Sequence, residues 1–334
     1  MNDPAARLRQ LLGGGMELPV MQAPTGSIAT PELAAAVSAA GGIGSLGLTW
    51  HTPEAAADAV RRTRLLTVAP FVANFALAFD PVGLPAVLEA GVPIVSFSWG
   101  DPAPYAPLLR SAGVPFGVQV GSRQEAAVAL GSRPDFLICQ GVEAGGHVQS
   151  SASLGSLMNA VAALGSDTPL IAAGGIADAE GIAGALLAGA CAVILGTRFV
   201  ATIESGAHEV YKHRLTTADG SDTRLTFCFR DGWPDARHRV LRNQTLEMWE
   251  AAGSPPPRER PGEGDVTAMR PDGSRVLRYD DAAPRADMTG DVEAMAMYSG
   301  TGCGRIREVV SAGPLTRVLG EEALERARLL TANG

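Results

Sequence analysis

Short apolar runs alternate with Ala-rich stretches over the first 199 residues. Apolar runs of this length, flanked by Gly and Pro, are typical of strands buried in a parallel sheet. The runs predict eight strands, at Leu18–Gln22, Ile43–Leu48, Thr67–Asn74, Pro93–Phe97, Pro115–Val120, Phe136–Cys139, Leu170–Ala173 and Ala192–Leu195. The stretches between them predict seven helices, at Pro31–Ala40, Pro53–Thr63, Leu84–Ala90, Ala103–Ser111, Ser122–Leu130, Ser153–Leu164 and Ala179–Ala188.

Helix signals support this alternation. Thr30-Pro31-Glu32 and Thr52-Pro53-Glu54 each place a capping hydroxyl before a proline at the first helical position, with an acid in the first turn. Open doubly wound sheets usually have fewer strands and one reversal of strand order, so eight successive units favour a closed barrel. We therefore expect an α/β fold, a (β/α)₈ TIM barrel with a small, mainly helical C-terminal lobe.

The pattern changes after Thr202. His208–Leu215, Thr245–Ala252, Asp291–Met297 and Pro314–Leu330 predict helices, and Leu225–Phe229 predicts one strand. Residues 253–287 are dense in Pro, Gly, Arg and Asp, which is typical of a long loop. We expect three parts: a barrel over residues 1–215, a mostly helical or irregular substrate lobe over 216–297, and a closing loop with a helix over 298–334.

Composition and charge narrow the class of protein. Hydrophobic residues make up 46% of the chain and charged residues 19%, as in a compact globular body, and there are 40 glycines. The net charge of −8 argues against nucleic-acid binding. The four cysteines are far apart, so neither a zinc site nor a disulfide framework is indicated. No segment resembles a signal peptide or a membrane span, so we expect a cytoplasmic monomer or homodimer.

Two glycine-rich loops follow the last two predicted strands. Gly174-Gly175-Ile176-Ala177-Asp178 follows the seventh strand and Gly196-Thr197-Arg198 follows the eighth. Barrels often bind phosphate between these loops, because backbone N–H groups converge there on the anion. The pair predicts a phosphate-bearing cofactor rather than plain turns. A G-x-G-x-x-G motif does not occur at the first strand, which argues against a dinucleotide-binding fold.

The loop after the sixth strand holds the best candidate for acid–base chemistry. Residues 140–147 read Gln-Gly-Val-Glu-Ala-Gly-Gly-His, and an imidazole at a strand's carboxyl end suits proton transfer near neutrality. His147 is therefore the candidate general base. Glu143 could be a second acid–base group, but a loop carboxylate is more often solvated or ion-paired. Metal spacings and a G-x-S-x-G elbow do not occur, and Cys139 is expected to pack as a small apolar residue.

Two further segments are candidates for ligand contact. Residues 22–27, Gln-Ala-Pro-Thr-Gly-Ser, lie at the carboxyl end of the first strand, where barrel active sites are built, although they could equally form an ordinary turn. Residues 298–304, Tyr-Ser-Gly-Thr-Gly-Cys-Gly, precede a helix and could close over a cofactor or simply join the two lobes.

Four segments together resemble the nitronate monooxygenase family, formerly called 2-nitropropane dioxygenases. Residues 21–24 with the stretch from Thr30 to Leu46 look like the family's opening motif, and residues 141–147 look like its histidine loop. Residues 169–176 and 196–199, continuing into 204–208, resemble its phosphate-binding half. The similarity covers most of residues 16–250 and the element at 298–305.

The resemblance implies a TIM barrel that holds FMN non-covalently and oxidises nitronates, or nitroalkanes after His147 removes a proton, with O₂ as the second substrate. The redox chemistry belongs to the flavin, and the protein supplies orientation and electrostatics. The cofactor contacts that we expect are Ala23, Pro24, Asn74, Gln140, Gly145, Gly146, Gly174, Gly175, Ile194, Leu195, Gly196, Thr197, Tyr298 and Gly300.

Three departures from the family pattern leave the choice of substrate open. They lie at Thr25-Gly26-Ser27, at Val148-Gln149-Ser150 and at Thr301. One alternative is an FMN- and NAD(P)H-dependent reductase of enoyl thioesters or quinones, because related barrels share the Gly-Gly-His loop. Others are a flavin-binding barrel without turnover, and a lyase or isomerase barrel that binds a phosphorylated metabolite.

Overall fold

A closed parallel barrel forms the body of the protein, which we describe from a computed structural model over residues 4–12 and 14–332. Its strands are β1 (Val20–Gln22), β2 (Gly44–Gly47), β3 (Phe71–Ala76), β4 (Ile94–Ser98), β5 (Phe116–Val120), β6 (Phe136–Gln140), β8 (Leu170–Ala173) and β9 (Ala192–Leu195). They are hydrogen-bonded in the order β1-β9-β8-β6-β5-β4-β3-β2, and a parallel bridge between Met21 and Ile43 joins β1 to β2. The eight-stranded barrel is confirmed.

Seven of the helices that follow the strands were predicted from the sequence, whereas the one-turn helix after β9 was not. They are α2 (Pro31–Ala39), α3 (Pro53–Leu66), α4 (Leu84–Glu89), α5 (Ala106–Ala112), α6 (Arg123–Gly131), α7 (Leu154–Ala162), α8 (Ala179–Leu187) and the one-turn α9 (Thr197–Val200). The caps form as expected, because Thr30 and Thr52 each accept a hydrogen bond from the N–H three residues on. β3 begins later than predicted, since α3 continues to Leu66 and Pro70 cannot donate to a ladder.

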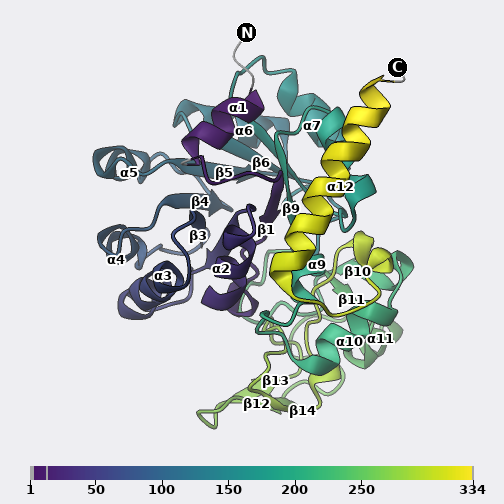
Figure 1. Ribbon diagram of the computed structural model, residues 1–334. Helices are drawn as coiled ribbons and strands as arrows, with labels where there is room; N and C mark the ends of the chain where they lie inside the picture. The colour runs from purple at the N-terminus through teal and green to yellow at the C-terminus, as the bar shows by residue number, and fades with distance from the viewer. Residues whose placement is uncertain (1–3, 13, 333–334) are drawn as a thin grey trace.

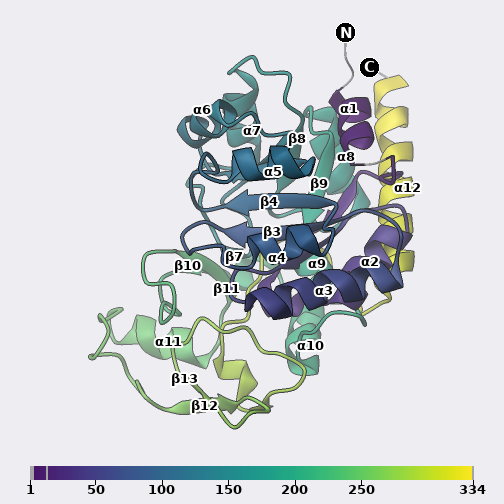
Figure 2. The same ribbon diagram turned by 90° about the vertical axis from the view of Figure 1, so that its left-hand side faces the viewer.

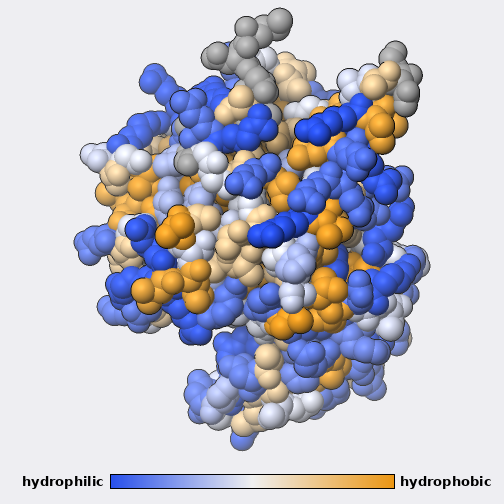
Figure 3. Space-filling view, viewed as in Figure 1, coloured by the Kyte–Doolittle hydropathy of each residue, from blue (hydrophilic) through white to orange (hydrophobic). Residues whose placement is uncertain are grey.

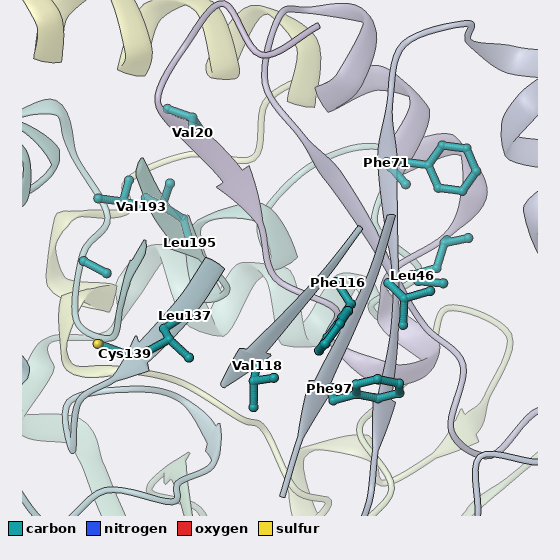
Figure 4. Packing of buried hydrophobic residues seen from close by; sticks show 14 of the residues in the cluster. Val20, Leu46, Phe71, Phe97, Phe116, Val118, Leu137, Cys139, Val193 and Leu195 are labelled. Carbon is teal, nitrogen blue, oxygen red and sulfur yellow. The ribbon is translucent and has the colours of Figure 1, made fainter. Parts of the chain in front are cut away.

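Side chains alternate between two apolar layers along each strand. In β9, Val193 and Leu195 point outward into the layer between strands and helices, whereas Ala192 and Ile194 point into the barrel. Figure 4 shows the outer layer, where Val193 and Leu195 lie with residues of neighbouring strands such as Cys139. Cys139 is thus a packed apolar residue, as expected, and burial raises the pKa of its thiol to about 12.

Two terminal helices cover the barrel. α1 (Pro4–Leu11) lies at the amino ends of the strands, where the fully buried Leu8 and Leu12 pack against the inward-facing residues. α12 (Ala312–Ala332) packs along α8 and α2, as Figures 1 and 2 show. The sequence predicted α12 but not α1. Of the helices in the described ranges, none combines the length and apolar character needed to cross a bilayer.

The lobe over residues 216–297 lies at the carboxyl ends of the barrel strands (Figures 1 and 2). Of the helices predicted after the barrel strands, α10 (Glu209–Thr217) forms just before the lobe and α11 (Gln244–Ala251) forms within it, but Asp291–Met297 contains only the 3₁₀ turn Val292–Ala294. The lobe also has two small antiparallel sheets. One joins β10 (Thr223–Thr226), β11 (His238–Leu241) and β7 (Gly146–His147), and the other joins β12 (Val266–Met269), β13 (Arg275–Leu277) and β14 (Thr289–Gly290).

The stretch 253–287 is therefore not a loop throughout, since it contains β12 and β13, and residues 216–297 hold more strand than predicted. These strands have two to four residues, too few to show a clear alternation of apolar and polar positions. On the face drawn in Figure 3, apolar residues occur in small groups among polar ones, as is usual for a protein surface.

Candidate functional site

A cavity of about 930 Å³ opens between the barrel and the lobe, at the carboxyl ends of the strands. Pockets of this size hold cofactors and drug-sized ligands. All the residues that the sequence analysis expected at the site line it, with the exception of Leu195. The Leu195 side chain lies in the outer apolar layer because β9 alternates, and its carbonyl accepts the N–H of Ala23 at 3.0 Å (Figure 4).

His147 lies in the strand β7, which pairs with β11 of the lobe. Its ring centroid is 4.5 Å from that of Trp233 and 5.4 Å from that of Tyr298. Burial, and secondarily the nearby His238, lowers the pKa of His147 to about 3, so the ring is neutral at pH 7. Its Nε2 atom is buried and has no hydrogen-bond partner among the described residues, which leaves it free for a ligand.

Gln140 braces the backbone around His147. Its Nε2 donates to the carbonyl of His147 at 3.2 Å, and its Oε1 accepts the N–H of Gln149 at 3.0 Å. Gln140 still lines the cavity, but both ends of its amide are already bonded to the histidine loop. Its role in this arrangement is to position His147.

His238 does not line the cavity but supports His147 from the neighbouring strand, a relationship that sequence reasoning missed. It lies opposite His147 across the β7–β11 pair and is fully buried. Its Nε2 accepts the N–H of Phe229 at 3.1 Å, and its Nδ1 lies 3.2 Å from the carbonyl of Ala236, to which it donates in the tautomer that serves both partners. Burial lowers the pKa of His238 to about 4, so this ring is also neutral.

Glycines shape the opposite end of the cavity. Gly174 and Gly175 have φ of +122° and +70°, in the region that favours glycine. A Cβ at Gly175 would lie 2.9 Å from the Glu143 Cβ and 3.0 Å from the Thr301 Oγ1, so no larger residue fits there. Gly196 faces this turn from the end of β9 and begins α9. The bare backbone of these loops can approach an anionic group closely.

The segment around Tyr298 and Gly300 closes the cavity from the side of the lobe. The N–H of Gly300 donates to the Thr197 Oγ1 at 2.9 Å, and a Cβ at Gly145 would clash with the Gly300 backbone. The Tyr298 hydroxyl donates to the carbonyl of Asp281 at 2.6 Å, and its own carbonyl accepts from the Tyr211 hydroxyl. The expected closing element therefore contacts the loop at Gly196 through Thr197 and the histidine loop through Gly145.

Glu143 does not line the cavity. Its carboxylate accepts the N–H of Leu154 at 3.0 Å, at the start of α7, and its carbonyl accepts the N–H of Thr301 at 3.0 Å. This arrangement ties three segments together and gives Glu143 no place at the reacting atoms. Of the positions that depart from the family pattern, Thr25, Gly26 and Ser27 line the cavity, whereas Gln149 and Thr301 do not. The Gln149 side chain bonds Gln119, which does line the cavity, and Glu125.

Aromatic side chains at the cavity mouth were also missed. Trp50, Phe79 and Trp99 follow the consecutive strands β2, β3 and β4, and Trp233 comes from the lobe. A signal existed, since Trp50 and Trp99 stand directly after predicted strands. The charged residues of the lining were missed as well, and these all come from the lobe: Arg270, Asp280, Asp281 and Arg285.

The lobe acids are partly buried. Burial, and secondarily the neighbouring Asp280, raises the pKa of Asp281 to about 6, and Asp280 lies 3.8 Å from the guanidinium of Arg270. Within the described ranges, no three His, Cys, Asp or Glu side chains gather in a way that could hold a metal ion. The chemistry that this lining can offer is a neutral imidazole, a bare glycine backbone, an aromatic wall and, on the lobe side, two arginines and two carboxylates.

Comparison with known proteins places these features in a family. The family model described as nitronate monooxygenase matches residues 13–84 and 80–322. A nitronate monooxygenase of Pseudomonas aeruginosa is 32% identical, with 95% of this chain and 98% of that protein covered. A solved structure of a nitroalkane oxidase from Streptomyces ansochromogenes is 31% identical with a TM-score of 0.77, covering 96% of this chain and 99% of that one.

A relative with a different activity also matches. It is the (3aS,4S,5R,7aS)-5-hydroxy-7a-methyl-1-oxo-octahydro-1H-indene-4-carboxyl-CoA dehydrogenase of Mycobacterium tuberculosis, 35% identical over 71% of this chain and 66% of that protein. The chain is thus similar both to proteins named for nitronates or nitroalkanes and to a dehydrogenase of a CoA thioester.

Proposed function

Since the chain belongs to the nitronate monooxygenase family, we propose that it uses FMN and O₂ to oxidise nitronates, and nitroalkanes after deprotonation, to carbonyl compounds. Membership makes it a flavin-dependent oxidoreductase; the choice of FMN and the substrate are the proposal. The observation that supports this proposal is the unpartnered Nε2 of a neutral His147 in the cavity wall. The opposite end of the cavity is formed by Gly174, Gly175 and Gly196, which we call the glycine cradle.

The residues present fit an FMN molecule. The turn at Gly174 and Gly175 packs against residues 141–144 and Thr301 as closely as it does because it carries no Cβ, and its backbone lines the cavity together with Gly196 and Thr197 of the next loop. These backbones would hold the phosphate, while Ala23, Pro24 and Asn74 would line the ring and the ribityl chain. When bound, the flavin takes electrons from the substrate and passes them to O₂.

The chain's own contribution to the chemistry is proton transfer. A nitroalkane loses its α-proton to the Nε2 of His147, and the electron pair of the broken C–H bond moves onto the nitro group, which yields the nitronate. Burial keeps His147 neutral and able to accept this proton, and Gln140 fixes its backbone. Because the cavity disfavours the imidazolium, His147 is a weak base on its own, and the negative charge of the nitronate formed beside it must stabilise the protonated ring during the transfer.

The proposal is tested with the purified protein under anaerobic conditions. We expect bound FMN, identified by its absorbance and by mass after release, and loss of the visible absorbance on mixing with ethyl nitronate. Admission of O₂ should then restore the absorbance and yield acetaldehyde. A protein that stays colourless with added FMN contradicts the proposal.

A second candidate is NAD(P)H-dependent reduction of a thioester or quinone. It is favoured by the similarity to a CoA thioester dehydrogenase and by two arginines, Arg270 and Arg285, in the cavity wall. Loss of absorbance with NADH or NADPH, but not with nitronate, would establish this reductase instead. Bound FMN that neither reagent bleaches would indicate a flavin-binding protein without turnover.

A further inference from the structure

Four aromatic side chains form one cluster at the cavity mouth, which we call the aromatic box: Trp50, Phe79, Trp99 and Trp233. Trp233 is its centre, with ring centroids 4.8 Å from Trp99, 5.0 Å from Phe79 and 6.1 Å from Trp50. Most of these pairs meet edge to face, so their rings stand as walls at steep angles to one another. All four rings line the cavity that contains His147.

The aromatic box and the glycine cradle lie on opposite sides of the barrel mouth. The box follows β2, β3 and β4, whereas the cradle follows β8 and β9. In the strand order, β5 and β6 separate these groups in one direction and β1 does so in the other. His147 lies beside the box, 4.5 Å from Trp233 between ring centroids. The box follows the ends of β2, β3 and β4, whereas Asn74 lies within β3, so a cofactor anchored at the cradle whose ring reaches Asn74 would leave the box for a second molecule.

The part of this lining that the barrel supplies carries no formal charge. Between Ser45 and Trp99, the described lining residues include Thr49, His51, Ser96 and Ser98 but no Lys, Arg, Asp or Glu. On the lobe side, the carboxylate of Asp281 lies next to the box, since a Cβ at Gly232 would come within 2.5 Å of the Asp281 Oδ1. The adjacent Asp280 faces Arg270. The barrel side of the box therefore offers an uncharged apolar surface, which suits an aromatic ring.

Two features of the box indicate that it is built for a ligand. Trp99 holds φ of +60°, which a residue with a side chain rarely adopts, and such strain is typical of ligand sites. Trp50 is 58% exposed although two aromatic rings stand beside it, so its indole offers apolar surface that a bound ring would cover.

We propose that the aromatic box is the subsite for an aromatic ring carried by the substrate, which places the ring's side chain at His147. The substrate class is thus an aryl-substituted compound rather than a short aliphatic one. The assignment of a nitronate as the reacting group rests on the proposed function, whereas the inference that the box binds an aromatic ring does not.

Binding of unreactive analogues tests the ring subsite separately from catalysis. Isothermal titration of the FMN-loaded protein compares 3-phenylpropionate with propionate, two carboxylates that share the charge of a nitronate. We expect the phenyl compound to bind at least tenfold more tightly, because its ring leaves water. Trp50→Leu and Phe79→Leu should each reduce this preference to threefold or less. Phe227→Leu, at an exposed ring outside the cavity, should leave it unchanged.

Three results would overturn the inference: equal binding of the two carboxylates, a preference that survives both substitutions in the box, or tighter binding of phenethylammonium than of 3-phenylpropionate. Steady-state kinetics supply a second test. The kcat/KM for the nitronate of 2-phenylnitroethane should be at least tenfold higher than that for ethyl nitronate. Trp50→Leu should remove most of this difference by raising the KM for the phenyl compound. If neither nitronate is oxidised but the binding preference holds, the proposed function fails while the ring subsite stands.

Discussion

His147 and His238 lie opposite each other in the antiparallel pair β7–β11, with ring centroids 5.5 Å apart. One ring faces the cavity with an unpartnered nitrogen, and the other has both nitrogens occupied by backbone groups. Both are neutral at pH 7 because burial lowers their pKa values. His238 thus supports the strand that carries His147 without adding a positive charge beside it.

The first prediction concerns the base. His147→Asn should lower kcat/KM for a neutral nitroalkane by roughly 10²–10⁴-fold, the range of general acid–base catalysis, and change it little for the corresponding nitronate. Steady-state rates on the two forms of nitroethane measure this. His213→Asn, on the exposed face of α10, is the matched control and should affect neither. Equal losses on both forms would show that His147 is not the base.

The second prediction concerns stability against pH. The pKa of His147 is about 3 in the folded protein and 6.5 in an unfolded chain, so below pH 6.5 the unfolded chain binds one more proton at this position. As the pH decreases, the contribution of His147 to the free energy of unfolding therefore decreases, by up to about 1.4 kcal/mol per pH unit between roughly pH 6 and pH 4. Above about pH 7 this contribution is constant.

Urea unfolding of the wild type and of His147→Asn at pH 7.5, 5.5 and 4.5 checks this prediction. The difference between the two proteins is the quantity to compare, because Asp281, with its pKa raised to about 6, contributes in the opposite sense in both. We expect the variant to gain stability relative to the wild type as the pH falls. A constant difference across this range would contradict the buried, neutral state of His147.

The third prediction concerns His238. In His238→Phe the N–H of Phe229 loses its acceptor inside the lobe, and a buried unsatisfied N–H costs about 1–3 kcal/mol. We expect a loss of this size in the free energy of unfolding, measured with urea at pH 7.5. His213→Phe, at an exposed position, should stay within about 0.5 kcal/mol of the wild type. Similar stabilities of the two variants would argue against the hydrogen bond.

The fourth prediction concerns the contact between Gly145 and Gly300. A Cβ at position 145 would clash with the Gly300 backbone, so Gly145→Ala must separate the histidine loop from the closing segment. We expect a lower Tm and less bound flavin per chain, measured by calorimetry and absorbance. Gly155→Ala is the control, since its Cβ would meet nothing within 4 Å, and it should leave flavin content unchanged. Full flavin content in Gly145→Ala would refute the close contact.

The barrel could be predicted from the sequence because its signals are local. Each strand is a short apolar run, and caps such as Thr30 and Thr52 mark helix starts through residues three positions away. The period of two along β9 was also available and would have placed Leu195 outside the cavity. The resemblance assigned every residue from Ile194 to Thr197 to the cofactor, without taking into account that side chains alternate between the two faces of β9.

What could not be predicted depends on segments that meet only in the folded protein. His238 has an ordinary sequence context, and only the pairing of β11 with β7 brings it to His147. The aromatic box likewise needs Trp233 from the lobe to join rings that follow three barrel strands. The short strands of the lobe are stabilised by such pairings rather than by a local pattern, so a single sequence carries little sign of them.

The bond from Gly300 to Thr197 spans 103 positions of the chain, and it has a consequence for synthesis. As the polypeptide leaves the ribosome, every barrel strand is available long before the segment that finishes the mouth. A nascent chain can therefore complete its barrel while one wall of the cradle is still missing. Capture of the cofactor becomes a late event, coupled to the arrival of residues 298–304 about a hundred positions after the last barrel strand.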